Sequence, residues 1–477
     1  MSLACALVGF ASTLSVVTPA QAATNTVVSL TFDDGNANQM TALPILNKYG
    51  MKGTFYIITG VIGTPNYLTR ANLSTLAASG NEIGAHSVNH PDLTGVPIDE
   101  AKRQICNSRA DLTDWGFRVT SFAYPYASAS TAVENATRDC GFNSARGLGD
   151  IASAHGCSGC DRAETLPPAD PYWLKAVDQI DTTWTLQQMK NVVTAAEGRG
   201  GGLVPFTFHN ICDGCDSLAI SPTVLDSFLS WLKARGALGT TVKTIDQAIG
   251  GTVKPVVRIP PPTNTGLTNT SLEQSTSGTG FPDCWMAGGW GSNNPVWSRT
   301  TDAHSGSFGQ RLDISGYVNG DAKLMPQMDL GSCSPSVTPG RTYNLGTWYK
   351  ATGITQYALY YRNATGAWAY WTSSPWFAAA STWTQATWTT PPVPAGASGM
   401  SFGLALITNG SLTTDDYTFA GSAGGSPAAK APATRSRPSG TTPVRATVIA
   451  RGAPTVPGAG AVRPGTLIAV PTPDDAH

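Results

Sequence analysis

The fold of this chain is decided by the stretch Val27-Val28-Ser29-Leu30-Thr31-Phe32-Asp33-Asp34-Gly35. Its β-branched and apolar residues are typical of a buried strand. Side chains alternate along a strand, so Val28, Leu30 and Phe32 predict a face packed against helices. The other face ends at Asp33 and points toward the interior. Gly35 permits a sharp turn, which brings the carboxylate of Asp34 toward the same interior.

Strand-like segments alternate with helix-like segments from Thr26 to about Gly250. Helices are predicted over 98–115, from an apolar stripe, and over 222–235, from Ser221 as N-cap with a proline in the first turn. Repeated β-then-α order predicts a parallel sheet, and we expect an α/β domain built as a distorted (β/α) barrel. The predicted strands are 27–32, 53–58, 82–85, 120–124, 175–177, 203–208 and 241–244.

The pattern changes after residue 250. A proline-, threonine- and asparagine-rich stretch at 251–266 predicts an exposed linker. From 267 to 419 short aromatic and β-branched runs, separated by turn residues, predict an all-β sandwich. The final stretch, 420–477, is rich in alanine, proline and glycine and is expected to be disordered.

Composition limits the classes of partner. The chain has 477 residues with 30 Lys+Arg against 31 Asp+Glu, a balance that argues against nucleic acid as a partner.

An apolar run at 3–17 followed by Ala20-Gln21-Ala22 predicts a signal peptide over 1–22, so the barrel domain is expected at 23–250. No other stretch is long and apolar enough to span a membrane. We therefore expect a secreted, extracellular monomer.

The number of cysteines is consistent with a secreted protein. Of the 9 cysteines, Cys5 lies in the predicted signal peptide, and the remaining even number predicts disulfides in an oxidising compartment. We expect Cys106 to pair with Cys140 and Cys284 with Cys333. Two C-x-x-C pairs, at 157/160 and 212/215, stay open between internal and crossed bridges. A structural zinc site built from these four thiolates is the alternative, and it requires a reducing compartment.

Three polar elements follow predicted strands. His86 and His90 are four residues apart after the third strand, and His209 ends a later one, although the chain has only 6 histidines. Two imidazoles at this spacing, with a carboxylate, form a two-histidine, one-carboxylate metal set that leaves positions open for water and substrate. Carboxyl ends of parallel strands meet on one side of a barrel, so a shared site with Asp33 and Asp34 is predicted there.

Thr-Phe-Asp-Asp-Gly at 31–35, His-Ser-Val-Asn-His at 86–90 and the strand-end His209 together resemble the polysaccharide deacetylase family, the NodB-homology carbohydrate esterases, over residues 26–249. The resemblance implies metal-dependent removal of acetyl groups, usually N-acetyl groups, from an acetylated polysaccharide. Chitin, peptidoglycan and exopolysaccharide remain alternatives for the polymer. Zinc is the first expectation for the metal, with cobalt, manganese and nickel as alternatives. An O-acetyl xylan esterase and a non-catalytic carbohydrate-binding protein are the competing functions.

The resemblance also implies roles for individual residues. By motif position, Asp33 is the general base and His209 the general acid. The backbone N–H of Tyr126 helps to hold the oxyanion. The metal ligands are Asp34, His86 and His90.

The sequence departs from the family pattern at three places. Ala123 stands where an arginine often braces the catalytic aspartate, so Arg146 or Arg162 is expected to replace it. Phe206 replaces a leucine and is expected to reshape the acetyl pocket, and Trp173 is expected to contact substrate. The Asp and Trp that tune the catalytic histidine have five candidates, namely Asp170, Trp173, Asp178, Asp181 and Trp184.

The second domain resembles the jelly-roll carbohydrate-binding modules of secreted polysaccharide enzymes. Nine tryptophans lie between Trp285 and Trp388, and flat aromatic rings stack on sugars. Most of these rings are expected to be core, because a sandwich of this size needs large apolar side chains. Such modules often hold a structural calcium, for which Glu273 and Asp416 are the expected ligands.

Overall fold

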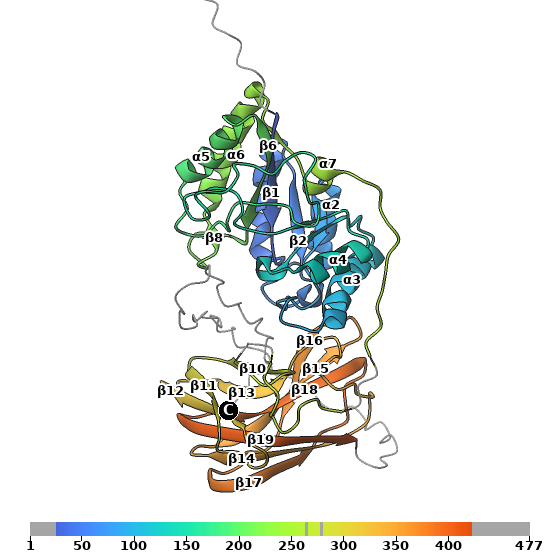
Figure 1. Cartoon of the computed structure of the whole chain (residues 1–477), viewed down its shortest axis with the longest axis vertical. Coiled ribbons are helices and arrows are strands. Elements are labelled where there is room, and N and C mark those ends of the chain that lie inside the picture. The colour runs from blue at the N-terminus through green and yellow to red at the C-terminus, as the bar shows by residue number, and fades with distance from the viewer. Residues whose placement is uncertain (1–24, 263–265, 277–279, 422–477) are drawn as a thin grey trace, which may run out of the picture.

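The computed structural model describes residues 25–262, 266–276 and 280–421 (Figure 1). An α/β unit comes first in the chain and an all-β unit second. The predicted signal peptide lies outside the described residues, as does the predicted tail except for its first two residues. Within the described part of the chain, none of the helices combines the length and the apolar character that a membrane crossing requires.

The α/β unit is built on one parallel sheet. Its strand order is β5-β4-β3-β2-β1-β6, with β9 also paired to β1. The predicted fold class is therefore confirmed for this unit. The strands are β1 (Asn25–Phe32), β2 (Gly53–Ile57), β3 (Glu82–Ala85), β4 (Ser121–Ala123), β5 (Ser144–Arg146), β6 (Gly201–Phe208) and β9 (Thr241–Val242).

Helices cover this sheet and create its core. Phe32 of β1 stacks between Phe55 and Phe208, with ring centroids 4.6 and 5.4 Å away. The predicted helix at 222–235 matches α6, whose N-cap Ser221 accepts a hydrogen bond from the N–H of Thr223. The helices are α1 (Ala42–Tyr49), α2 (Arg70–Ala78), α3 (Ile98–Asp114), α4 (Thr131–Asp139), α5 (Leu186–Glu197), α6 (Pro222–Arg235) and α7 (Ile245–Ile249). A small pair, β7 (Asn210–Ile211) and β8 (Ala219–Ile220), follows β6.

The barrel is distorted where β5 and β6 do not pair. An irregular segment lies there, bonded first to β5 through the N–H of Gly147 and the carbonyl of Leu174, and then to β6 through the N–H of Val177 and the carbonyl of Pro205. Pro205 has no N–H to return a bond, so a regular ladder cannot form. The prediction of a strand at 175–177 is therefore wrong, although its backbone does help to close the barrel.

The second unit is a sandwich of two antiparallel five-stranded sheets, which confirms the all-β prediction. Its core includes Trp285 and Tyr417, whereas Trp376 is 67% exposed. The first sheet has the order β10 (Trp285–Trp290), β13 (Asp321–Pro326), β18 (Ala397–Leu406), β15 (Thr355–Asn363) and β16 (Trp368–Ser373). The second has β11 (Asn294–Thr300), β12 (Gly309–Ser315), β19 (Gly410–Gly421), β14 (Tyr343–Ala351) and β17 (Ala380–Thr389).

Four disulfides join the described cysteines. Cys106 pairs with Cys140 and Cys284 with Cys333, as expected from the sequence. The two C-x-x-C pairs form internal bridges, at 157/160 and 212/215, which settles the alternative left open above. A zinc site of four thiolates is therefore wrong, since oxidised sulfurs are not available as thiolate ligands.

Arg109 of α3 fixes the start of the predicted linker. Its buried guanidinium donates hydrogen bonds to the carbonyls of Lys254 and Pro255, at 2.7 and 2.9 Å. The same group donates to the carbonyls of Val119 and Cys140. One side chain thus ties the segment that leaves the barrel to the outer helix layer.

We predict that Arg109→Met lowers the free energy of unfolding by about 3 kcal/mol, because four carbonyls lose a charged, buried donor. Urea denaturation of the whole chain measures the change. Arg162→Met is the matched control, since Arg162 is exposed, and its expected change is within about 0.5 kcal/mol. Equal stability of the two variants would contradict the assignment.

Candidate metal centre

Three strand ends bring the predicted residues to one edge of the barrel. Asp33 follows β1, His86 follows β3 and His209 follows β6. In the parallel register Phe32 lies opposite Phe208, and the N–H of Asp33 donates to the carbonyl of Phe208 at 2.9 Å. The residues after β1 and β6 therefore leave the sheet side by side.

Asp34, His86 and His90 form a compact ligand group. Asp34 Oδ1 lies 3.5 Å from His86 Nε2 and 3.6 Å from His90 Nε2. One ligand atom from each residue falls within 4.8 Å of the others. This is the only group of three or more His, Cys, Asp or Glu with such spacing in the described ranges. The predicted metal ligands are thus brought together.

The orientation of the imidazoles fits a bound cation. His86 Nδ1 lies 2.8 Å from the carbonyl oxygen of Ala123, so Nδ1 carries the proton and Nε2 presents a lone pair. His90 Nε2 lies 3.0 Å from His86 Nε2. Two imidazole lone pairs this close repel each other unless a proton or a metal ion lies between them. With the adjacent carboxylate, the donor set suits zinc and related divalent ions.

Protonation of the ligand group is set by burial and by its own charges. Burial opposes ionisation of Asp34, but its hydrogen bond with His86 and the charges of three histidines hold the pKa of Asp34 below its usual range. Burial and the charge of His86 lower the pKa of His90 to about 3. Burial lowers the pKa of His86 too, yet the bond to Asp34 and the nearby carboxylates outweigh it, so the net pKa of His86 is raised. Asp34 is thus ionised and His90 neutral at pH 7, as metal ligation requires, whereas at Nε2 of His86 a metal ion competes with a proton.

The backbone around this group is strained. Asp34, Ser87, His90 and Tyr126 all have left-handed φ values, of 78°, 66°, 57° and 56°. Such conformations are uncommon outside glycine and are retained where the surroundings fix them, often at functional sites. Here they turn the two aspartates and the two histidines toward a common point.

Asp33 is buried beside the ligand group and is braced by Arg146 of β5. The Arg146 guanidinium donates to Asp33 Oδ2 and to the carbonyl of Gly147. It also lies over the ring of Tyr56, 5.2 Å from its centroid. Asp33 Oδ1 is buried without a hydrogen-bond partner. Of the two arginines expected to brace Asp33, Arg146 therefore makes the contact, whereas Arg162 is exposed.

His209 is held from its backbone by a residue that sequence reasoning missed. Gln39 is fully buried, and its Nε2 donates to the carbonyl of His209 at 2.8 Å and to the carbonyl of Asp33. Gln39 thus clamps the ends of β1 and β6. Nδ1 of His209 is buried and has no hydrogen-bond partner. The sequence gives no periodic signal for Gln39, which lies in a short 3₁₀ turn at Ala37–Thr41.

Tyr126 closes one side of the group. It belongs to the turn at Pro125–Ala127 after β4, and its ring meets that of His90 edge to face at 4.6 Å. The left-handed φ of Tyr126 bends the chain after Pro125 toward the ligands. The residue expected to help hold an oxyanion therefore lies against His90, one of the predicted metal ligands.

The predicted substrate residues lie in different places. Phe206 is fully buried and packs against Phe228 of α6, on the helix side of β6, so the structure places it in the core. Trp173 is half-buried, stacks on Tyr124 at 5.9 Å and donates its N–H to Asp150 at 2.9 Å. Of these two, only Trp173 is partly accessible, and its contact with substrate stays a prediction.

The other candidates for the Asp and Trp that tune the predicted catalytic histidine make local contacts. Trp184 is buried against His155, with ring centroids 4.6 Å apart. Asp170 accepts from the N–H of Tyr172, and Asp181 from Thr183. Asp178 accepts from the N–H of Gln179. These contacts order the irregular segment that closes the barrel.

The predicted calcium ligands of the sandwich hold one loop. Glu273 accepts hydrogen bonds from the N–H groups of Ser307 and Phe308, at 2.9 and 3.0 Å. Asp416 pairs with His304 Nδ1 at 2.5 Å and accepts from Ser305 Oγ. Both carboxylates therefore already have donors from residues 304–308, and calcium at this loop stays a prediction.

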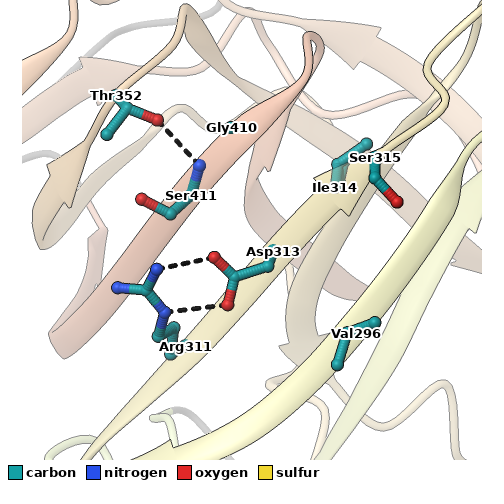
Figure 2. A pocket seen from close by; sticks show the side chains of 8 residues that line it. All are labelled: Val296, Arg311, Asp313, Ile314, Ser315, Thr352, Gly410 and Ser411. Carbon is teal, nitrogen blue, oxygen red and sulfur yellow. Dashed lines mark hydrogen bonds and ion pairs between the residues drawn. The ribbon is translucent and has the colours of Figure 1, made fainter.

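A hollow of about 340 Å³ lies on the sandwich, over β11, β12 and β19 (Figure 2). Arg311 and Asp313 line it and form a two-bonded ion pair at 2.8 and 2.6 Å. Thr352 Oγ1 similarly accepts from the N–H of Ser411 at 2.8 Å. Because these polar groups satisfy each other, the hollow has no reactive group comparable to Asp33 and its neighbours.

The fold and the site define a (β/α)-barrel protein with a two-histidine, one-carboxylate group at its carboxyl edge. Residues 20–145 match the family model described as polysaccharide deacetylase. The peptidoglycan-N-acetylglucosamine deacetylase PgdA of Listeria monocytogenes is 30% identical over 126 residues, 26% of this chain and 26% of the relative. The peptidoglycan-N-acetylmuramic acid deacetylase PdaC of Bacillus subtilis is 37% identical over 115 residues, 23% of each.

Among solved structures, a family 4 acetyl xylan esterase from Clostridium thermocellum is 21% identical with a TM-score of 0.33, covering 46% of this chain and 89% of that one. Over residues 20–145 the chain is therefore similar to the polysaccharide deacetylase family. The family match includes Asp33, His86 and His90 but ends before His209 and before the sandwich. The chain spans less than half the length of the curated relatives it matches.

We predict that the metal-free protein binds one zinc or cobalt ion and that His90→Ala weakens this binding by at least roughly 100-fold, because one of three protein ligands is lost. Competition with a chromophoric chelator measures the affinity. His155→Ala is the control, since His155 is not in the ligand group, and its affinity should be unchanged. Equal affinities for the two variants would show that the ion binds elsewhere.

Proposed function

We propose that the barrel domain is a metal-dependent polysaccharide deacetylase that hydrolyses N-acetyl groups of an N-acetylglucosamine polymer. One observation carries this proposal. The Asp34–His86–His90 group, which fits a divalent ion such as zinc, lies at the same barrel edge as a buried carboxylate and a buried histidine, Asp33 and His209. Acetyl hydrolysis needs a Lewis acid, a base and an acid in one place.

Asp33 is the proposed general base. Asp34, His86 and His90 would hold a divalent ion, which would supply Lewis-acid chemistry to an acetyl carbonyl and to water. Asp33 Oδ1 has no hydrogen-bond partner, so it can accept the proton that water loses as its oxygen attacks the acetyl carbon. Arg146 holds the other oxygen and fixes the carboxylate in that orientation.

His209 is the proposed general acid. Breaking the carbon–nitrogen bond leaves an amine that needs a proton, and histidine is the side chain that exchanges protons near neutral pH. Gln39 binds the carbonyls of both Asp33 and His209, so it fixes the separation of base and acid. The backbone N–H of Tyr126 is proposed to stabilise the negative charge on the acetyl oxygen. Trp173 is proposed as a contact for the sugar at the rim.

The preference for N-acetyl groups rests on the relatives. PgdA and PdaC, by their names, act on N-acetylated sugars of peptidoglycan. Peptidoglycan is therefore the first polymer to test, with chitin second.

Secretion is part of the same proposal, and it is supported by the oxidised state of all eight described cysteines.

A sugar-binding role for the sandwich rests on its exposed rings. Trp376 is 67% exposed and Trp290 is 40% exposed, whereas large hydrophobic side chains are usually buried. Flat exposed indoles can stack on pyranose rings. Binding of the sandwich to the polymer would raise the local concentration of substrate at the barrel.

We predict that Asp33→Asn reduces acetate release from N-acetylated polymer by about 100-fold or more while metal content stays the same, because the amide cannot accept the proton. Acetate is measured enzymatically on peptidoglycan, chitin oligomers and acetylxylan, with and without a chelator. Release from acetylxylan alone would favour the O-acetyl esterase. Polymer binding without any acetate release would favour a non-catalytic carbohydrate-binding protein.

Arg146→Met is expected to lower kcat by roughly 10- to 100-fold with little change in metal affinity, because Asp33 loses the donor that orients it. Steady-state kinetics and chelator competition on the same preparation give both quantities. Arg162→Met, an exposed arginine, should leave kcat unchanged. If the two variants have the same kcat, Arg146 is not the brace.

A further inference from the structure

The loop that carries the histidine ligands is held by contacts outside the ligand group. Between His86 and His90, the N–H of Asn89 donates to Oε1 of Gln104 at 2.9 Å. The carbonyl of Val88 accepts from the N–H of Gly60 at 2.8 Å, and the Val88 side chain is fully buried. The middle of the loop is therefore fixed from its outer side.

Gln104 belongs to α3 and is 1% exposed. Its Nε2 donates to Oε1 of Glu100 at 2.9 Å. The backbone N–H of Asn89 can only donate, so the amide oxygen of Gln104 must face it and the amide nitrogen must face Glu100. Gln104 thus has one orientation, and it transmits the position of Glu100 to the loop.

Glu100 is bound by the sandwich domain. Its Oε1 also accepts from the N–H of Leu330 at 2.7 Å, across 230 residues of sequence. Its Oε2 accepts from Arg103, which in turn donates to Ser332 of the sandwich. Figure 1 places α3 at the junction between the barrel and the sheet that contains β15 and β16. Buried polar groups on α3 are therefore satisfied from both domains.

The sandwich loop that supplies Leu330 is itself rigid. The carboxylate of Asp329 accepts from the N–H groups of Gly331, Cys333 and Ser334. Arg362 of β15 donates to the carbonyl of Asp329 at 2.9 Å. The disulfide from Cys333 to Cys284 anchors the loop to the start of β10. Such a loop can act as a fixed support.

A second contact reaches the histidine loop directly. Gly366, in the turn between β15 and β16, has a φ of +88°, and a Cβ there would lie 3.1 Å from Val88 Cγ1 and 2.8 Å from Leu330 Cδ2. The turn therefore packs against Leu330 and Val88, and a methyl group at Gly366 would force these side chains to shift. The sandwich supports the loop at Val88 and, through Glu100 and Gln104, at Asn89.

We propose that the sandwich domain is a structural part of the metal site, with Gln104, Glu100 and Gly366 as positioning residues for the His86–His90 loop. The sandwich then has a role that is separate from any polymer binding. The consequence for catalysis rests on the proposed function, but the consequence for metal binding does not, because it concerns the geometry of the ligands alone.

The test measures zinc and cobalt affinity of the metal-free, full-length chain by chelator competition. Gly366→Ala is expected to weaken binding about 10- to 100-fold, because its methyl group crowds Leu330 and Val88 and so shifts the histidine loop. Gly340→Ala is the matched control. Gly340 has a φ of +81°, and no atom lies within 4 Å of the position that its new methyl group would take. This variant carries the same backbone strain without the contact, so its affinity should not change.

Gln104→Met is the second variant, with Asn107→Met as its control. Asn107 lies on the same helix and binds the carbonyl and N–H of Ile259 but not the histidine loop. Both changes lower stability, yet only Gln104→Met should weaken metal binding, again about 10- to 100-fold, and speed hydrogen exchange of the Asn89 amide. Affinities within twofold of the original chain for Gly366→Ala and Gln104→Met would overturn the proposal, as would failure of the original chain to bind metal. Weakened metal binding in a chain that releases no acetate would refute the deacetylase proposal alone.

Discussion

The site depends on the parallel register of β1 with its neighbours. Phe32 lies opposite Phe208 on one side and Phe55 on the other, and β1 and β6 end at the same level. The stacked rings make a slip of one residue costly, because it would turn the apolar face of β1 into the interior. Once this register is fixed, Asp33 and His209 are neighbours as a matter of geometry.

Placing polar groups at this edge has an energetic cost. The ion pair between Asp33 and Arg146 is almost fully buried, and desolvation of such a pair can exceed its Coulomb attraction. The Tyr56 ring beneath the guanidinium and the carbonyl of Gly147 offset part of this cost. The core of the barrel therefore supplies the stability, and the ion pair at its edge fixes the orientation of the Asp33 carboxylate.

The sequence alone predicts those parts of the fold and site whose residues are adjacent in the chain or follow a regular pattern. The ligand group and β1 were predictable because each motif directly follows a strand with a clear pattern. Gln39 was not, because its role depends on two carbonyls that are far apart in sequence, at Asp33 and His209. The burial of Phe206 was not predictable from its motif position, because it depends on which face of β6 the residue occupies. Residues 175–177 have the composition of a strand, whereas the proline that removes a ladder hydrogen bond lies in the neighbouring strand β6, so the segment itself gives no sign of it.

The polar face of α3 shows what a single helix pattern leaves out. An amphipathic helix predicts that Glu100, Arg103 and Gln104 meet water, yet all three are buried. Burial of charged and amide groups is tolerated only where partners satisfy them, and here some of the partners come from a domain more than 200 residues later. Two domains joined by a free tether would leave these groups hydrated and the histidine loop supported on one side only. The docked arrangement makes the precision of a metal site a property of both domains.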